Sequence, residues 1–118
     1  MDIIYLHGLK CECTIGVWDW EKAIKQTLVL DIELATDAAK AAVNDNLNDA
    51  LDYQAITKRV QAFASDNAFE LIETLAEKLA ALILNEFDTT WVKIKLDKGR
   101  AVAGVKNVGV LIERNQAI

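Results

Sequence analysis

The chain has 118 residues and a mass of 13.1 kDa, which fits one domain built around one hydrophobic core. Its 53% hydrophobic content argues against disorder, and its net charge of −5 disfavours nucleic acid and anionic membranes as main partners. The apolar runs are too short for a transmembrane helix, and an acid at position 2 makes a poor start for a signal peptide. We therefore expect a single domain over residues 1–118, located in the cytoplasm.

The first part of the chain is expected to form two strands. The first strand covers about residues 2–13, and a loop follows at residues 17–22. The second strand is predicted at residues 26–36, where apolar and polar residues alternate as they do in a half-buried strand. Cys11 and Cys13 share a face of the first strand but lie too far apart for ordinary disulfide geometry. We expect them to be reduced and to behave as small apolar residues.

Helices are predicted in the middle of the chain. The alanine-rich residues 37–43 predict a short helical turn, and a loop follows it. Asp52 suits the N-cap of a helix that runs to about Ser65. Asn67 suits the cap of a second helix that runs to about Phe87, because apolar residues recur there at helical spacing.

Two further strands are predicted at about residues 89–97 and 105–113. In the first of them, Lys93 and Lys95 alternate with apolar residues and are expected to pair with Asp31 and Glu33 on a polar sheet face. The element order β-β-α-α-β-β is typical of an α+β fold in which helices cover one face of a four-stranded, mainly antiparallel sheet. Such a sheet has exposed edges, so we expect a homo-oligomer in which strands from several subunits close into a barrel.

Few side chains in this sequence suit metal binding or nucleophilic catalysis. His7, Cys11 and Cys13 are the only histidine and cysteines, and all three fall in one predicted strand. A zinc site usually takes three or four such ligands, so no metal site is predicted. No Ser/His/Asp or Cys/His arrangement and no glycine-rich phosphate-binding motif is present.

The remaining candidates are carboxylates, lysines and aromatic residues, and each has a structural interpretation as well as a functional one. Glu73 on the second predicted helix fits a solvated acidic face or a ligand-binding carboxylate. Tyr53 fits the edge of the core or a catalytic position. Trp18 and Trp20 fit surface packing or an oligomer contact. Lys98, where the strand alternation ends, fits a solvated lysine or a proton-transfer group. The pattern alone leaves these alternatives open.

Several segments in order resemble the dihydroneopterin aldolases of folate biosynthesis. They are TIGVWDWE at 14–21, LDYQAI at 51–56, LIETLAEKLA at 71–80, and IKLDK at 94–98 followed by NVGVLIER at 107–114. The similarity covers nearly the whole chain. It implies the tunnelling fold, which has the same β-β-α-α-β-β order, and ring-shaped tetramers or stacked octamers with active sites between subunits.

The resemblance also implies roles for individual residues. Glu73 matches the carboxylate that anchors the pterin by accepting paired hydrogen bonds. Ile72 matches a position that contacts the substrate through its backbone, and Glu21 matches an acid of the substrate pocket. Tyr53 matches a tyrosine supplied by the neighbouring subunit, which stacks near the substrate ring and helps proton transfer. Lys98 matches the catalytic lysine that gives and takes protons.

The reaction implied by the resemblance is a retro-aldol cleavage that needs neither a metal nor a Schiff base. The dihydropterin ring carries its own imine, which takes the electron pair of the broken carbon–carbon bond. We therefore expect no cofactor. 7,8-Dihydroneopterin gives 6-hydroxymethyl-7,8-dihydropterin and glycolaldehyde, and re-addition of glycolaldehyde would give epimerisation to 7,8-dihydromonapterin.

Two alternatives remain, together with one departure from the family pattern. A dihydroneopterin triphosphate epimerase would share the fold but needs a basic cluster, to which Arg100 and Lys106 could contribute. The other alternative is a non-catalytic pterin-binding module. The family usually has proline after the catalytic lysine, where this chain has Gly99. Glycine predicts a less rigid turn at this point.

Overall fold

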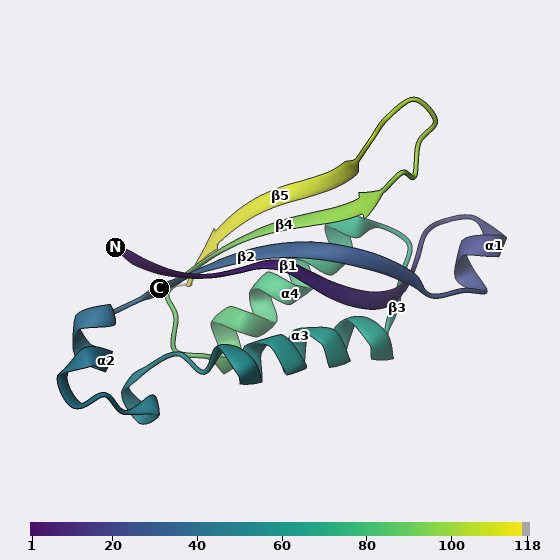
Figure 1. Ribbon diagram of the computed structural model, residues 1–118. Coiled ribbons are helices and arrows are strands. Elements are labelled where there is room, and N and C mark those ends of the chain that lie inside the picture. Colours follow the sequence, from purple (N-terminus) through teal and green to yellow (C-terminus); the bar gives the residue numbers. More distant parts are fainter. Residues whose placement is uncertain (117–118) are drawn as a thin grey trace.

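A computed structural model, which describes residues 1–116, shows one sheet with two long helices against one of its faces (Figure 1). The strands are β1 (Asp2–Ile15), β2 (Gln26–Thr36), β3 (Ala68–Phe69), β4 (Trp91–Gly99) and β5 (Val108–Asn115). The long helices are α3 (Tyr53–Asp66) and α4 (Ile72–Glu86). The short helical segments are α1 (Asp19–Lys22), α2 (Ala38–Asn44) and the 3-10 turn η1 (Leu47–Asp49).

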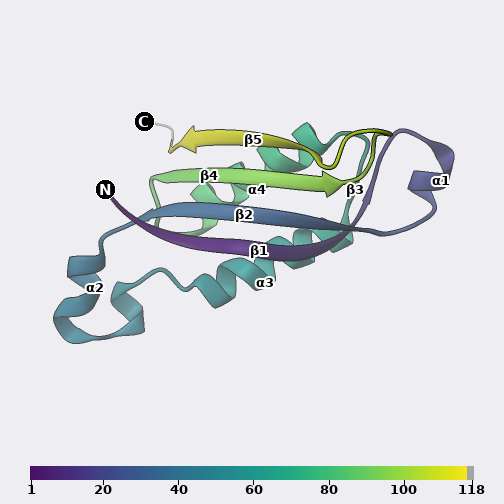
Figure 2. The ribbon, with the colours of Figure 1, turned by 45° about the horizontal axis from the view of Figure 1, so that its top comes forward.

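The strand order is β3-β1-β2-β4-β5, and the four long strands run antiparallel to their neighbours (Figure 2). The predicted α+β class and the predicted order of the main elements are confirmed. The expected four-stranded sheet was wrong by one strand, because β3 adds a fifth. β3 pairs in parallel with the end of β1, Thr14 opposite Ala68 and Ile15 opposite Phe69. A two-residue strand is too short to produce an alternating pattern, so β3 could not be predicted from periodicity.

The helix caps confirm one prediction and correct another. Asp52 is the N-cap of α3, and its side chain accepts a hydrogen bond from the backbone N–H of Ala55 at 3.0 Å. Asn67 does not cap the second long helix, because α4 begins only at Ile72. Asn67 instead ends α3, where its side chain donates to the carbonyl of Phe63 at 2.9 Å.

The segments predicted as loops contain short helices. Residues 17–22 include α1, and residues 44–49 include η1. The helical turn predicted for the alanine-rich segment is confirmed as α2. The last strand lies slightly later than expected, at residues 108–115 instead of 105–113.

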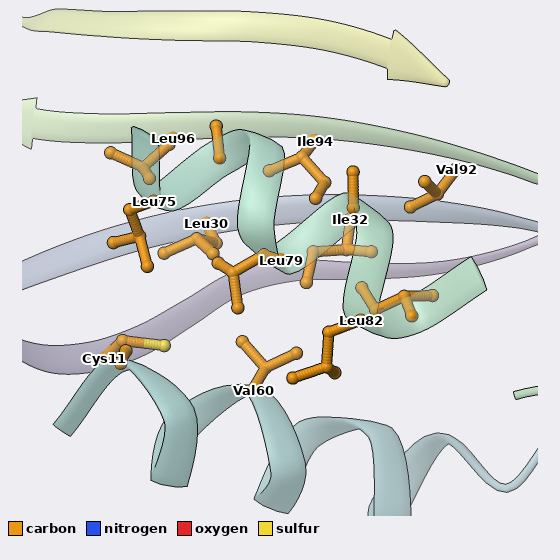
Figure 3. Close-up of a cluster of buried hydrophobic side chains, with 14 of the residues drawn as sticks. Cys11, Leu30, Ile32, Val60, Leu75, Leu79, Leu82, Val92, Ile94 and Leu96 are labelled. Carbon is orange, nitrogen blue, oxygen red and sulfur yellow. The ribbon is translucent and has the colours of Figure 1, made fainter. Parts of the chain in front are cut away.

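The core lies between the sheet and the two long helices. Figure 3 shows leucine and isoleucine side chains of β2, β4 and α4 meeting there, with Val60 of α3 and Cys11 of β1. Cys11 and Cys13 are buried and free, as predicted. Burial raises the pKa of the Cys11 thiol to about 11 and raises that of Cys13 as well, so both thiols stay protonated near neutral pH.

A β-bulge changes the phase of β1 partway along the strand. Leu6 pairs with Ile32 and Leu9 with Leu30, so two residues of β1, His7 and Gly8, oppose one residue of β2. The residue opposite is Asp31, whose Oδ1 accepts the backbone N–H of Gly8 at 2.8 Å. Because of the extra residue, core-facing side chains sit at even positions before the bulge and at odd positions after it.

The face of the sheet away from the helices carries charged side chains. Glu33 lies opposite Lys93 in the register, and their charged groups are 4.0 Å apart, which confirms that pairing. Asp31 lies opposite Lys95, but its carboxylate is engaged by Gly8. Within residues 1–116, every helix is too short or too polar to span a lipid bilayer.

Candidate active site

A buried ion pair joins Lys98 and Glu21 at one end of the sheet. Lys98 Nζ donates a hydrogen bond to Glu21 Oε2 at 2.8 Å. The two side chains are only 14% and 6% exposed, whereas every other ion pair within residues 1–116 joins side chains that are at least 32% exposed. A buried ion pair contributes little net free energy to folding, because the cost of desolvating the two charges offsets most of their attraction. A buried pair beside a cavity is therefore a candidate for chemistry.

The position of Lys98 follows from the two-residue period of β4. Lys98 is in phase with Ile94 and Leu96, which are buried against the helices. Its side chain consequently leaves the sheet on the same side, just beyond the last core residue. Lys93 and Lys95, in the other phase, belong to the opposite face. The sequence contained this signal, since a lysine in the phase of the core needs a partner for its charge.

Glu21 is held in place by the turn between β1 and α1. Its Oε1 accepts the backbone N–H of Trp18, the residue before the helix, at 3.3 Å. Gly16 lies directly behind the carboxylate and has φ of +135°, and a Cβ at this position would overlap the carboxyl group of Glu21. The N–H of Gly16 donates to the carbonyl of Phe69 at 3.0 Å, which ties the turn to β3.

The environment of Glu21 favours the ionised carboxylate. The hydrogen bond from Lys98 lowers the pKa of Glu21, and the N–H of Trp18 acts in the same direction, while burial opposes both. The net effect is a pKa below the ordinary value of a glutamate. Glu21 is therefore negatively charged at neutral pH.

A cavity of ≈ 620 Å³ lies directly beside the ion pair. Glu21 and Lys98 line it together with Ile72 and Glu73 from the first turn of α4. This volume is in the range of pockets that hold small molecules. The positive end of the α4 helix dipole favours a carboxylate at Glu73. Four of the five predicted site residues thus meet at one pocket.

Tyr53 is the predicted site residue that lies elsewhere. It is the first residue of α3, is 52% exposed, and lines a separate groove of ≈ 260 Å³ with residues 3–6 of β1. In Figures 1 and 2, α3 begins at the end of the sheet far from α1. The expectation that Tyr53 acts in a neighbouring subunit's pocket stays a prediction.

Two tryptophans of the pocket wall were not predicted to be there. Trp18 and Trp20 line the cavity and are 64% and 63% exposed. Arg100 lines it as well. At the rim, Lys22 and Glu70 form an ion pair at 3.1 Å that links α1 to the segment before α4. Two exposed tryptophans around an acidic residue were the available signal for a binding surface, since large exposed aromatics are enriched at such sites.

The glycine after Lys98 has a defined conformation. Gly99 has φ of +77°, and its N–H donates to Asp97 Oδ1 at 2.6 Å. Proline has neither an N–H nor access to positive φ, so it could not adopt this backbone conformation. Gly99 thus makes a hydrogen bond that a proline would lack, and the expected loss of rigidity in the turn stays a prediction.

Among residues 1–116, no three His, Cys, Asp or Glu side chains gather in a way that could hold a metal ion. The absence of a cofactor stays a prediction.

The chain is similar to known dihydroneopterin aldolases over nearly its whole length. The family model described as dihydroneopterin aldolase matches residues 4–113. The Escherichia coli K12 dihydroneopterin aldolase is 47% identical over 114 residues, covering 97% of this chain and 93% of the relative. The crystal structure of the E. coli enzyme in complex with neopterin has a TM-score of 0.93, at 47% identity, and covers 98% of this chain and 100% of that one.

A structure of a Vibrio cholerae protein described as a putative dihydroneopterin aldolase matches with a TM-score of 0.94, at 43% identity, and covers 98% of both chains. The E. coli dihydroneopterin triphosphate 2'-epimerase is more distant, at 26% identity over 110 residues, 93% of this chain and 92% of the relative. The similarity is thus greater to the aldolases than to this epimerase.

Proposed function

The chain belongs to the dihydroneopterin aldolase family and has its lyase activity, and we propose that the chemistry takes place in the Glu21–Lys98 pocket. The substrate is 7,8-dihydroneopterin, and the products are 6-hydroxymethyl-7,8-dihydropterin and glycolaldehyde. The observation that carries the proposal is the buried Lys98–Glu21 ion pair at 2.8 Å, on a cavity also lined by Glu73.

The reaction breaks the bond between the first and second carbons of the substrate side chain. A base removes the proton of the second carbon's hydroxyl, which becomes the carbonyl of glycolaldehyde. The electron pair of the broken bond moves into the ring imine, and the ring nitrogen takes a proton. Protonation of the first side-chain carbon, with loss of the proton from the ring nitrogen, then restores the imine and leaves the hydroxymethyl product. The protein therefore has to supply and remove protons, while the substrate ring itself accepts the electron pair.

Lys98 is the proposed proton donor and acceptor. Its ammonium is already directed into the pocket by Glu21, at a defined point on the pocket wall. The negative charge of Glu21 orients this ammonium and limits the positions that it can occupy. Bound water and Tyr53 share the proton transfer in this proposal. Lys98 acts as an acid and base and forms no bond to carbon.

Glu73 is the proposed anchor of the pterin ring. It belongs to the first turn of α4 and lines the same cavity as Lys98. The amino group and the neighbouring N–H of a pterin present two parallel donors, which a carboxylate accepts in a planar, orienting arrangement. The backbone of Ile72, one residue earlier, contributes further contacts. Glu73 and Lys98 thus fix the ring and the reacting side chain from different elements.

We further propose that Tyr53 reaches the pocket from a second subunit in a tetramer or octamer. The sheet ends at β5, and β3 covers only the last residues of β1, so both long edges are open to another strand. Exposed Tyr5 on β1 and Leu111 on β5 fit burial at such an interface. The radius of gyration, 15.4 Å, exceeds the roughly 13–14 Å expected of a compact domain of this length. The expected cytoplasmic location stays a prediction.

Triphosphate epimerisation is the less favoured function. Lys98 and Arg100 are the basic side chains that line the cavity, against the acidic Glu21, Glu70 and Glu73. A triphosphate needs a concentration of positive charge, and this lining has more acids than bases. A non-catalytic module is also less favoured, because binding alone gives no reason to bury the ion pair. Epimerisation of dihydroneopterin itself remains compatible with the proposed reaction.

The test is incubation of the chelator-treated protein with dihydroneopterin and, separately, with its triphosphate. We expect stoichiometric glycolaldehyde and 6-hydroxymethyl-7,8-dihydropterin from the first substrate, with little turnover of the second. Absence of glycolaldehyde would refute the aldolase assignment. Epimerised triphosphate without cleavage would favour the alternative.

A further inference from the structure

The carboxylate of Asp97, next to Lys98, holds both ends of the loop at residues 99–107. Oδ1 accepts the backbone N–H of Gly99 at 2.6 Å, at the start of the loop. Oδ2 accepts the side-chain amide of Asn107 at 2.5 Å, at its end. One side chain therefore closes the loop that follows Lys98. We call Asp97 and Asn107 the loop clamp.

The loop clamp surrounds a β-bulge whose extra residue is Lys98. Asp97 pairs with Gly109 and Gly99 pairs with Val108, so Lys98 has no partner of its own in β5. A bulge turns the strand and redirects a side chain, and this one is completed by the positive φ of Gly99. The hydrogen bond from Gly99 to Asp97 spans Lys98 and fixes the local bend.

The opposite strand is also fitted closely to the bulge. A Cβ at Gly109 would overlap the backbone carbonyl of Leu96, so β5 approaches β4 here more closely than an alanine would allow. This close approach comes directly before the point where the pairing shifts. The shift is therefore defined by contacts from both strands.

Asp97 does not itself belong to the pocket. It lines a separate, smaller hollow with Lys95, Asn107 and Gly109, whereas Lys98 lines the cavity beside Glu21. The route by which its carboxylate would position the reacting group is therefore the backbone that carries Lys98. The position of the Lys98 ammonium is restricted, because it bonds to Glu21 Oε2 at 2.8 Å and both side chains are largely buried.

We propose that Asp97 is a positioning residue that, with Asn107, sets the bulge and so aims Lys98 at the pocket. This inference rests on the proposed role of Lys98 in proton transfer. Loss of the loop clamp frees the bulge to relax into other pairings, which moves the ammonium relative to a bound pterin. A small misplacement of a reacting group lowers turnover strongly while leaving the ring-binding groups in place.

The test compares kcat for dihydroneopterin with the Kd of neopterin in Asp97→Ala, Asp97→Asn and Asn107→Ala. For Asp97→Ala we expect kcat to fall about 10- to 100-fold, with the Kd of neopterin nearly unchanged. Asn107→Ala removes only one bond of the loop clamp, so its loss of kcat should be smaller. The double variant should be no slower than Asp97→Ala alone, since both changes disrupt one unit.

The conservative variant separates hydrogen bonding from charge. The amide introduced by Asp97→Asn can accept from Gly99 and donate to Asn107 once the amide of Asn107 turns over. We therefore expect most of the kcat to return. A loss as large as that of Asp97→Ala would show that charge matters and would overturn the positioning role.

Asp31→Ala is the matched control, because Asp31 also accepts the N–H of a bulge glycine, Gly8, but lies away from the cavity. It should lower stability without lowering kcat. If Lys98→Ala is inactive and Asp97→Ala keeps the original kcat, the positioning role of Asp97 is refuted while the proposed role of Lys98 stands. If Lys98→Ala keeps its turnover, the proposed role of Lys98 fails instead. Should Asp97→Ala not fold, Asn107→Ala carries the test, and an unchanged kcat there would contradict the proposal.

Discussion

The α-carbon of Gly16 lies directly against the carboxylate of Glu21, so the pocket's buried acid occupies space that any other residue at position 16 would fill with its side chain. The carboxylate fits between this glycine, the N–H of Trp18 and the ammonium of Lys98. A packing requirement in the turn after β1 is thus coupled to the position of the Lys98 ammonium.

Gly16→Ala should therefore impair turnover. The new methyl group has to displace the Glu21 carboxylate, which would move the Lys98 ammonium, and we expect kcat to fall by about 100-fold. The unfavourable φ adds a loss of about 1–3 kcal/mol in the free energy of unfolding. Gly8→Ala is the control, since Gly8 also has positive φ but its Cβ would meet open space. Equal loss of kcat in both variants would contradict the steric explanation.

Lys98 and Glu73 should separate turnover from binding. Lys98→Ala removes the proton-transfer group, so kcat should fall about 10²–10⁴-fold with little change in the Kd of neopterin. Glu73→Ala removes two charge-assisted hydrogen bonds to the ring, so the Kd should rise roughly 10- to 100-fold. Steady-state kinetics and a fluorescence titration with neopterin measure the two quantities. The reverse assignment of effects would refute the proposed roles.

The Lys98–Glu21 pair should make the protein less stable in acid. Because the folded state lowers the pKa of Glu21, its contribution to stability is complete above the ordinary value of 4.5. That contribution is lost as the pH falls through the lower pKa of the folded state. Glu21→Gln should therefore lower the free energy of unfolding more at pH 7 than at pH 3, as measured by urea titration. Glu113→Gln, on an exposed strand position, should show a small effect at both pH values.

Tyr53 should complement Lys98 between subunits. Tyr53→Ala and Lys98→Ala homo-oligomers should each have low activity, while mixed oligomers made by co-expression contain some sites with both wild-type residues. Random mixing places an intact Tyr53 and an intact Lys98 together at about a quarter of the sites. Recovery of about that fraction of activity is the expected result. If every mixture stays as inactive as its parents, both residues act within one subunit or Tyr53 has no role.

Sequence periodicity predicted the parts of the fold that repeat over many residues. The alternation in β2 placed Leu30 and Ile32 in the core, and the side chain of Asp52 indicated the start of α3. Such patterns reflect burial along a whole element, so they are visible without tertiary information. The resemblance then added Glu73 and Lys98, which share the pocket.

The missed features depend on contacts between distant segments. β3 is a strand only because Ala68 and Phe69 meet the end of β1, and Asn67 consequently ends α3 instead of starting α4. The need for glycine at position 16 follows from the position of the Glu21 carboxylate. The bulge at Lys98 follows from the pairing of β4 with β5. Local propensity contains no information about these partners.

The sequence separation of 77 between Glu21 and Lys98 also sets an order of events during synthesis. The ribosome releases Glu21, both strands of the first hairpin and both long helices before β4 emerges, and domains begin to fold while the chain grows. Until β4 adds to β2, the carboxylate has no ammonium to meet and has to remain hydrated. The nascent chain can therefore build most of its core before Lys98, the partner of Glu21, has been synthesised.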